Sequence, residues 1–175
     1  MSKAETTQGV VKNLIGILAC AVLVIFLGVV VPYGIVSSEN HEVIPQLTSI
    51  RFLGPFLIGL GILGYLLCFS SFLVNAQGAP VLGAAQKRLV VKGLYRYVRN
   101  PMYLSWFLIL LGEGILFRSF DLLFYLMIWI VFFHLNVVFS EEPYLRATFG
   151  ESYEQYCNSV PRWIPRLKRI PKVST

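Results

Sequence analysis

Charged residues are scarce in this chain of 175 residues: only 14% are Asp, Glu, Lys or Arg, whereas 56% are hydrophobic. A soluble domain carries about a quarter of charged residues, so the composition excludes an ordinary soluble fold. The charges gather in loops and near the end of the chain, and long uncharged runs lie between them. Runs of that length cross a bilayer as helices, so the sequence predicts a polytopic membrane protein.

Cysteine is also rare, with Cys20, Cys68 and Cys157 as its three positions. No pair has the spacing of metal ligands, so we predict neither a metal site nor a disulfide framework. No convincing signal peptide is present, because the first apolar run exceeds the roughly 7–15 residues of an h-region. The net charge of +6 reflects basic cytoplasmic loops that contact anionic membrane lipids, so we expect no nucleic-acid partner. No obligatory protein partner is evident either.

The hydrophobic runs predict an all-α, polytopic membrane helical bundle of four transmembrane helices plus a C-terminal interfacial helix. The first run has 23 residues, about 35 Å as a helix at about 1.5 Å per residue. A kink is expected near its end, at Pro32 and Gly34. The expected spans are 14–36, 52–74, 101–117 and 122–139, with a tail helix over 140–158 that Gly150 can interrupt.

We expect residues 1–175 to form a single domain, in which 1–74 supply two spans and 75–166 supply a central loop, a helical hairpin and the tail. The hairpin follows from the short turn at 118–121, which makes the third and fourth helices antiparallel. Four glycines in the second span either allow close approach of a neighbouring helix or reflect the frequency of glycine in membrane helices. They are Gly54, Gly59, Gly61 and Gly64.

Basic residues predict the orientation in the membrane. The central loop and the tail are rich in Lys and Arg, whereas residues 37–50 contain none. Four spans place the N-terminus, the central loop and the C-terminus on one side, and the positive-inside rule makes that side cytoplasmic. We therefore expect an integral protein of a bacterial inner membrane or an ER-type membrane, with both termini and the site on the cytoplasmic side.

The stretch that leads into the third helix is basic and aromatic. Asn100 is a favourable N-cap, whose side-chain oxygen can accept from a first-turn amide, and Pro101 suits the first helical position. Arg96 and Arg99 add positive charge beside the free amides, which favours binding of an anion such as a carboxylate or phosphate. The acidic pair Glu141-Glu142 follows the next span and is expected at the same face of the membrane.

Four elements occur in order along residues 75–166. They are Tyr95-Arg96-Tyr97-Val98-Arg99-Asn100-Pro101-Met102-Tyr103, Glu141-Glu142-Pro143-Tyr144-Leu145, Phe149-Gly150 with Tyr153 and Tyr156, and Val160-Pro161-Arg162-Trp163-Ile164-Pro165. This series resembles the isoprenylcysteine carboxyl methyltransferase and phospholipid methyltransferase superfamily, which are integral membrane enzymes that use S-adenosylmethionine. Members often have His where this chain has Asn100, and a glycine-proline element is reduced here to Gly78-Ala79-Pro80.

The resemblance implies S-adenosylmethionine as cofactor and S-adenosylhomocysteine as its product. The implied cofactor contacts are Arg99, Pro101, Tyr103, Glu141 and Glu142, with Asn100 at the helix start. A carboxylate suits Arg99 and the helix N-terminus, and an ammonium or ribose hydroxyls suit the glutamates. A lipophilic acceptor would enter from the bilayer. Prenylcysteine carboxylate, phospholipid amine and thiol acceptors all remain open, and no catalytic residue is identified.

Two ionisable residues lie within the expected spans and are functional candidates by default. Glu113 lies nearer the far interface, where it can also be a helix-end carboxylate that reaches solvent or pairs with Arg118. His134 shares a helical face with Val138 and Glu141, which makes a cofactor-pocket residue and a structural histidine equally plausible.

These two residues also support a different class of protein, a small membrane transporter or binding protein with an ion path through Glu113 and His134. Polar residues concentrate at one interface and no internal repeat is visible, which favours the enzyme. A further alternative is an NADPH-dependent membrane reductase of related architecture.

Overall fold

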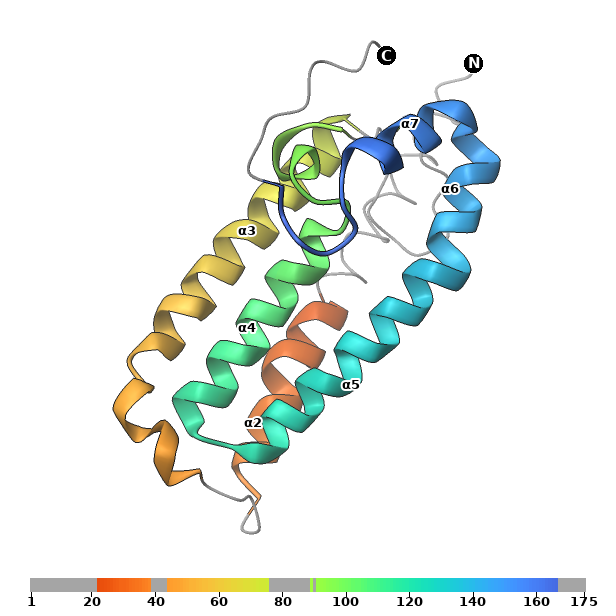
Figure 1. The fold of residues 1–175 in the computed structure, drawn as a ribbon. Coiled ribbons are helices and arrows are strands. Elements are labelled where there is room, and N and C mark those ends of the chain that lie inside the picture. The colour runs from red at the N-terminus through yellow and green to blue at the C-terminus, as the bar shows by residue number, and fades with distance from the viewer. Residues whose placement is uncertain (1–21, 39–43, 76–88, 90, 167–175) are drawn as a thin grey trace, which may run out of the picture.

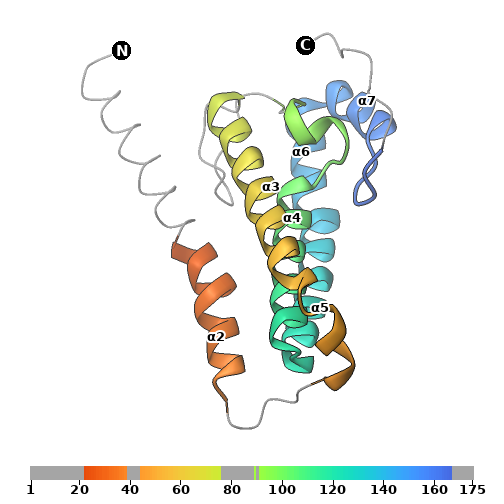
Figure 2. The same ribbon diagram turned by 90° about the vertical axis from the view of Figure 1, so that its left-hand side faces the viewer.

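The computed structural model describes residues 22–38, 44–75, 89 and 91–166, and those residues contain helices and no strand. Figures 1 and 2 show α2, α3, α4 and α5 running along one common direction, with α6 and α7 at one end. The α-helices are α2 (Val31–Val36), α3 (Leu53–Asn75), α4 (Pro101–Phe117), α5 (Phe120–Asn136), α6 (Glu142–Phe149) and α7 (Glu151–Ser159). The π- and 3-10 segments are η1 (Phe26–Val30), η2 (Pro45–Ile50), η3 (Gly93–Arg96) and η4 (Val137–Glu141).

The expected helical bundle is confirmed in its coarse form. Two described helical stretches, Leu53–Ser71 and Phe120–Phe149, are long and apolar enough to cross a membrane, and Val22–Val36 and Pro101–Phe117 are shorter apolar helices. The number of four transmembrane helices therefore stays a prediction, and residues 14–21 of the first expected span lie outside the described residues.

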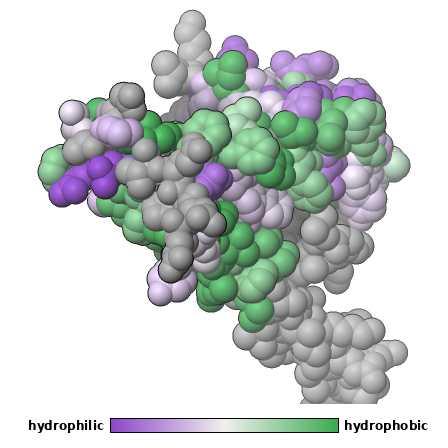
Figure 3. Space-filling view, turned by 90° about the horizontal axis from the view of Figure 1, so that it is seen from below, coloured by the Kyte–Doolittle hydropathy of each residue, from purple (hydrophilic) through white to green (hydrophobic). Residues whose placement is uncertain are grey.

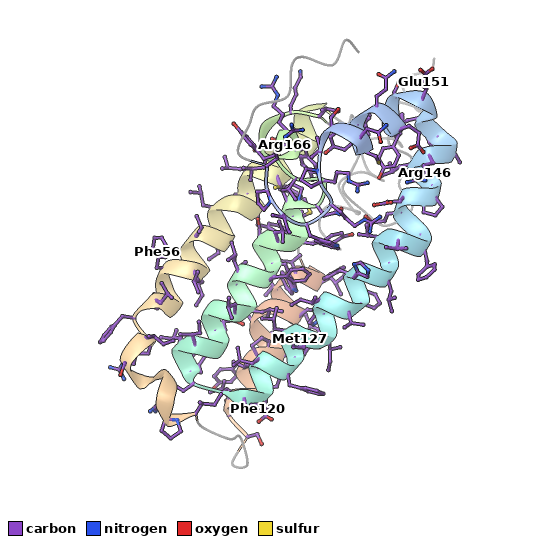
Figure 4. The ribbon with its side chains drawn as sticks, in the orientation of Figure 1. Phe56, Phe120, Met127, Arg146, Glu151 and Arg166 are labelled. Carbon is purple, nitrogen blue, oxygen red and sulfur yellow. The ribbon has the colours of Figure 1, made fainter. Side chains whose placement is uncertain are left out.

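The outer surface of the helices is apolar. Phe56 is 65% exposed and Met127 54% exposed, and Figure 4 shows Phe56 on the outer side of α3. Figure 3 shows hydrophobic side chains over much of the described surface seen from below, with hydrophilic side chains toward its margins. Exposing so large an apolar surface to water is unfavourable. These helices therefore face lipid, and the chain is a membrane protein.

Helices α3 and α4 pack closely through glycine. A Cβ at Gly54 would lie 2.7 Å from the Gly112 carbonyl oxygen, and one at Gly61 would lie 2.7 Å from the Ser105 carbonyl oxygen. Gly64 likewise approaches the Ser105 hydroxyl, so close approach is the correct one of the two interpretations at three of the four glycines. Gly59 has nothing within 4 Å of its Cβ position, so close approach does not account for it.

The hairpin between α4 and α5 is as predicted. Arg118 adopts the left-handed conformation with φ of 54°, which ends α4. Ser119 caps α5 by accepting a hydrogen bond from the Leu122 amide at 3.3 Å. A turn of two residues therefore joins the two helices, which run antiparallel.

The predicted start of the tail helix at residue 140 is wrong, because no helix begins there. Helix α5 continues through the π-segment η4 into α6, which makes Phe120–Phe149 one continuous helical stretch. Pro143 does not end it, because this proline stands in the first turn of α6, directly after the shifted hydrogen-bond ladder of η4. The expected break falls at Gly150, whose φ of 52° turns the chain into α7. A second π-segment, η1, precedes Pro32, at the end of the first span where a kink was expected.

Candidate functional site

The segment before α4 and the segment after α7 lie against each other at one end of the bundle. The Arg99 amide donates to the Pro161 carbonyl at 2.9 Å, and the Arg166 amide donates to the Tyr97 carbonyl at 2.8 Å. We call residues 160–166 the closing segment. Its hydrogen bonds with residues 97–99 place the basic stretch before α4 and the closing segment in one layer.

A small apolar cluster supports this layer from α7. Tyr153, Tyr156 and Val160 are buried together, with Leu89 and Val91 packed against them. Burial raises the pKa of the Tyr156 phenol, which therefore stays protonated. Its hydroxyl donates to the Tyr95 carbonyl at 2.7 Å. This bond ties α7 to η3, directly before the motif.

Asn100 stands at the N-cap of α4, but its predicted capping bond is wrong. The side chain makes no capping hydrogen bond, and its Nδ2 donates to the Arg162 carbonyl at 3.2 Å instead. The side chain of Asn100 therefore bonds to the closing segment and not to the amides of α4. Pro101 occupies the first turn of α4, as predicted, and is buried.

Glu142 is the centre of an ion cluster at this end of the molecule. Only 5% of the residue is exposed. Arg162 binds it in a bidentate manner, with Nε to Oε1 at 2.6 Å and Nη2 to Oε2 at 3.0 Å. Arg99 donates from Nη1 to Oε1 at 3.1 Å, and Arg146 lies 3.7 Å from Oε2. The hydrogen bond to Glu142 raises the pKa of the Arg162 guanidinium, which keeps it charged.

The cluster retains capacity for an anion. Three guanidinium groups face the single buried carboxylate of Glu142, and the remaining described acid of the cluster, Glu154, lies 3.5 Å from the half-exposed Arg146. Arg99 also donates from Nη1 to Cys157 Sγ at 2.9 Å. Its Nε is buried and has no hydrogen-bond partner among the described residues. A buried donor of this kind calls for an acceptor.

Glu141 is held separately from Glu142. Its Oε1 accepts a hydrogen bond from the Tyr103 hydroxyl on α4 and another, at 2.7 Å, from Asn136 Nδ2. Asn136 and Glu141 are five residues apart, which is the spacing of the π-turn η4. The face predicted for His134, Val138 and Glu141 stays a prediction, because the ordinary 3.6-residue repeat on which it depends is altered within η4.

An aromatic wall lies beside Glu141. The ring of Tyr103 stacks on Phe133 with centroids 4.3 Å apart, and Trp163 approaches Tyr103 at 6.5 Å and Phe107 at 6.0 Å. Trp163 also donates from Nε1 to His134 Nδ1 at 3.1 Å. His134 therefore contacts the closing segment, and its ring stands at the edge of the aromatic wall.

The structure brings six of the seven sequence-predicted site residues into two connected networks. Arg99 and Glu142 meet at the ion cluster, which Asn100 joins through the Arg162 carbonyl, and Tyr103 and Glu141 form the second network. His134 joins through Trp163. Glu113 lies far along α4, with carboxyl oxygen Oε2 buried and without a partner among the described residues, so the expected pairing with Arg118 does not satisfy that oxygen.

Sequence reasoning missed four residues of the site, which are Asn136, Cys157, Arg162 and Trp163. Two of them had a signal, since Arg162 and Trp163 lie between prolines in the fourth element of the resemblance. Asn136 is a polar residue in an apolar span, which is a signal for function in membrane helices. Among the described residues no group of three or more His, Cys, Asp or Glu side chains is arranged to hold a metal ion.

Two comparisons with known proteins bear on this site. A sequence model of the family "Phospholipid methyltransferase" matches residues 49–152. Protein-S-isoprenylcysteine O-methyltransferase of Schizosaccharomyces pombe (strain 972 / ATCC 24843) is 38% identical over 116 residues, which cover 63% of this chain and 48% of the relative. The chain thus spans about half the length of the curated relative that it matches.

Proposed function

Since the chain belongs to the phospholipid methyltransferase family, we propose that it is a membrane methyltransferase that uses S-adenosylmethionine and acts on a lipophilic acceptor. The observation that carries the proposal is the ion pair of Arg99 with Glu142, next to Glu141, which accepts from Tyr103, at one end of the bundle. The matched range of 49–152 contains these four residues. The name of the curated relative favours a carboxylate oxygen of a prenylated cysteine as the acceptor, and phospholipid amines and thiols are the other candidates.

The residues present fit the cofactor's polar groups. Arg99 has a buried Nε without a partner among the described residues, which suits the cofactor carboxylate. Glu141 accepts its two described hydrogen bonds at Oε1, which leaves Oε2 for the ammonium or the ribose hydroxyls. Tyr103 and Trp163 offer ring faces for the adenine or the sulfonium. Pro101 and Asn100 place the first turn of α4 beside them.

Glu142 acts on the cofactor indirectly. Its carboxylate already faces Arg99, Arg146 and Arg162, so it holds the guanidinium of Arg99 in place instead of binding an ammonium itself. Arg162 is a positioning residue for the same reason. Because its own carbonyl accepts from Asn100, it also ties the closing segment to the start of α4.

The chemistry needs positioning more than acid–base assistance. When bound, S-adenosylmethionine supplies a methyl carbon on a sulfonium, whose carbon–sulfur bond breaks as the acceptor's lone pair attacks, and S-adenosylhomocysteine remains. The chain's own residues bind, orient and exclude water: Arg99 and Glu141 fix the polar end, and the aromatic wall of Tyr103, Phe133 and Trp163 covers it. A carboxylate acceptor needs no proton removed, whereas an ammonium or thiol acceptor needs a base.

The cytoplasmic side is proposed from the distribution of charge. The described basic residues at the site end are Lys92, Arg96, Arg99, Arg146, Arg162 and Arg166, and those at the opposite end are Arg51 and Arg118. The positive-inside rule places the richer end in the cytoplasm. The acceptor would reach the site sideways from the bilayer, along the apolar surface of α4 and α5.

Calorimetric titration of the detergent-purified protein with S-adenosylhomocysteine, with NADPH as the comparison ligand, tests the function. We expect S-adenosylhomocysteine alone to bind. Arg99→Ala should lose affinity, and Arg51→Ala, the same change at the opposite end, should not. Binding of NADPH alone would favour the reductase, and binding of neither ligand by folded protein would favour the transporter. Equal affinity in Arg99→Ala would contradict the site assignment.

A further inference from the structure

One side chain of the closing segment bridges α4 and α5. Figure 1 shows the segment, in dark blue, as a loop that runs down from α7 toward the start of α4. The ring of Trp163 approaches Phe107 of α4 with centroids 6.0 Å apart and His134 of α5 with centroids 6.1 Å apart. Trp163 Nε1 also donates to His134 Nδ1 at 3.1 Å. This hydrogen bond joins the closing segment to α5.

The rest of the closing segment is held without His134. Backbone hydrogen bonds join the segment to residues 97–99, and Arg162 binds Glu142 through two nitrogens. Neither contact involves α5. Loss of the hydrogen bond to His134 would therefore release the indole of Trp163 from α5 while the two ends of the segment stay in place.

The bond between the indole and the imidazole requires a neutral histidine. An indole N–H can only donate, so the ring nitrogen that faces it must offer a lone pair. A neutral imidazole has one such nitrogen, whereas both nitrogens of an imidazolium carry a proton and donate. Rotation of the His134 ring therefore does not restore an acceptor once it is charged. Protonation of His134 and the hydrogen bond from Trp163 exclude each other.

The titratable and charged groups on the elements around His134 are engaged elsewhere. Tyr103 of α4 donates to Glu141, and Arg162 of the closing segment binds Glu142. In the described part of the chain, no ion pair joins any of these groups to His134. The remaining two are Arg166, whose Nη1 donates to the Ser159 carbonyl at 3.1 Å, and Glu113, which lies ten residues beyond Tyr103 on α4, about 15 Å along the helix.

We propose that Trp163 and His134 form a pH-sensitive latch on the aromatic wall. With neutral His134 the indole stays across α4 and α5. Histidine ordinarily changes its charge between about pH 5 and 8, and His134 is exposed, so a proton can reach it. As the pH falls through that range, two donors come to face each other and the indole leaves His134 and Phe107. Weaker retention of the cofactor in acid is a consequence that rests on the proposed function; the latch itself does not.

Indole NMR of the purified protein in detergent tests the latch, since the chain has only three tryptophans. The ¹⁵N-labelled Nε1 resonance of Trp163 is identified by its absence in Trp163→Phe and is followed from about pH 8 to about pH 5. A soluble, uncharged gadolinium chelate reports the exposure of each indole through line broadening. We expect the Trp163 resonance to shift with a one-proton titration and its broadening to rise about fivefold in acid, which is the effect of one lost hydrogen bond. Trp106 and Trp129 are internal references for the folded state and should not change.

Substitutions of histidine provide the controls. His134→Asn keeps an acceptor at the position of Nδ1 but cannot be protonated, so the shift and the exposure of Trp163 should stay constant with pH. His134→Phe keeps a ring without an acceptor and should expose Trp163 at every pH. The chain's other histidine, His41, lies outside the described residues, and His41→Asn should leave the titration of Trp163 as it is in the wild-type protein.

Three results would overturn the proposal. The first is a Trp163 resonance that does not titrate in the folded wild-type protein, and the second is one that titrates equally in His134→Asn. The third is a resonance that shifts while its exposure stays constant, because the indole would then remain stacked on the imidazolium. Every readout is taken without S-adenosylhomocysteine, so failure of the latch and failure of the proposed function are distinguishable.

Discussion

Arg162 donates two hydrogen bonds to the Glu142 carboxylate, from Nε at 2.6 Å and from Nη2 at 3.0 Å. The two residues are twenty positions apart in the sequence. The geometry is the fork-to-fork arrangement that makes arginine stronger than lysine toward carboxylates. It joins the closing segment to α6, and Arg99 donates to the same carboxylate at Oε1. Closure of the chain's end and placement of the basic motif therefore depend on one glutamate.

Glu142→Gln should both destabilise the protein and weaken S-adenosylhomocysteine binding. The change leaves three guanidinium groups without their common counter-charge, at a cost of about 2 kcal/mol, reduced from the range for buried pairs because Arg146 and Arg162 reach solvent. Thermal unfolding in detergent and calorimetry measure the two effects. The matched control is Glu154→Gln, which removes only an exposed partner of Arg146 and should cost less than about 0.5 kcal/mol. Equal melting temperatures for the two variants would refute the central role of Glu142.

Tyr103→Phe should lower the affinity for S-adenosylhomocysteine by about tenfold while the protein stays folded. The variant keeps the ring stacked on Phe133 and removes only the hydroxyl that donates to Glu141. Glu141 then loses one of the two donors that orient it. Calorimetric titration gives the affinity, and Tyr144→Phe on the exposed face of α6 is the control. An unchanged affinity in Tyr103→Phe would mean that Glu141 does not contact the ligand.

Trp163→Ala should loosen the closing segment. The indole ring packs near Tyr103 and Phe107 and donates to His134, and alanine loses all three contacts. Trypsin, which cleaves after arginine, should then cut at Arg162 and Arg166 about tenfold faster, because cleavage follows local opening. Trp163→Phe keeps a ring and should show a smaller increase. If S-adenosylhomocysteine binds under the segment, it should slow cleavage of the wild-type protein.

Gly61→Ala should destabilise the α3–α4 pair by about 1–3 kcal/mol, because its Cβ would lie 2.7 Å from the Ser105 carbonyl oxygen and force the helices apart. Gly59→Ala, one half-turn away on the same helix, meets nothing within 4 Å and serves as the matched control. Thermal unfolding of both variants in the same detergent gives the difference. A melting temperature for Gly61→Ala at or above that of Gly59→Ala would contradict the close packing.

The sequence predicted correctly which segments lie at the same end of the bundle. It did not predict which side chains form hydrogen bonds with one another there. The motif at Arg99 and the Glu141-Glu142 pair do meet, because the short turn at Arg118 and Ser119 returns α5 to the level at which α4 begins. The capping role of Asn100 failed because its Nδ2 donates to the Arg162 carbonyl, sixty-two residues away in sequence, which orients the side chain toward the closing segment. No sequence signal indicated η4, which changes the helical repeat between His134 and Glu141.

The sequence by itself determined the membrane setting, the helical hairpin, the family and the end of the bundle that carries the charges. These follow from the length of apolar runs, from turn residues and from the order of motifs, all of which are local properties of the chain. The tertiary structure decided which groups pair: Glu142 with three arginines, Trp163 with His134, and Tyr103 with Glu141. Pairing is decided by atoms a few ångströms apart that belong to segments distant in sequence. Their competition for donors and acceptors is settled only when the helices pack.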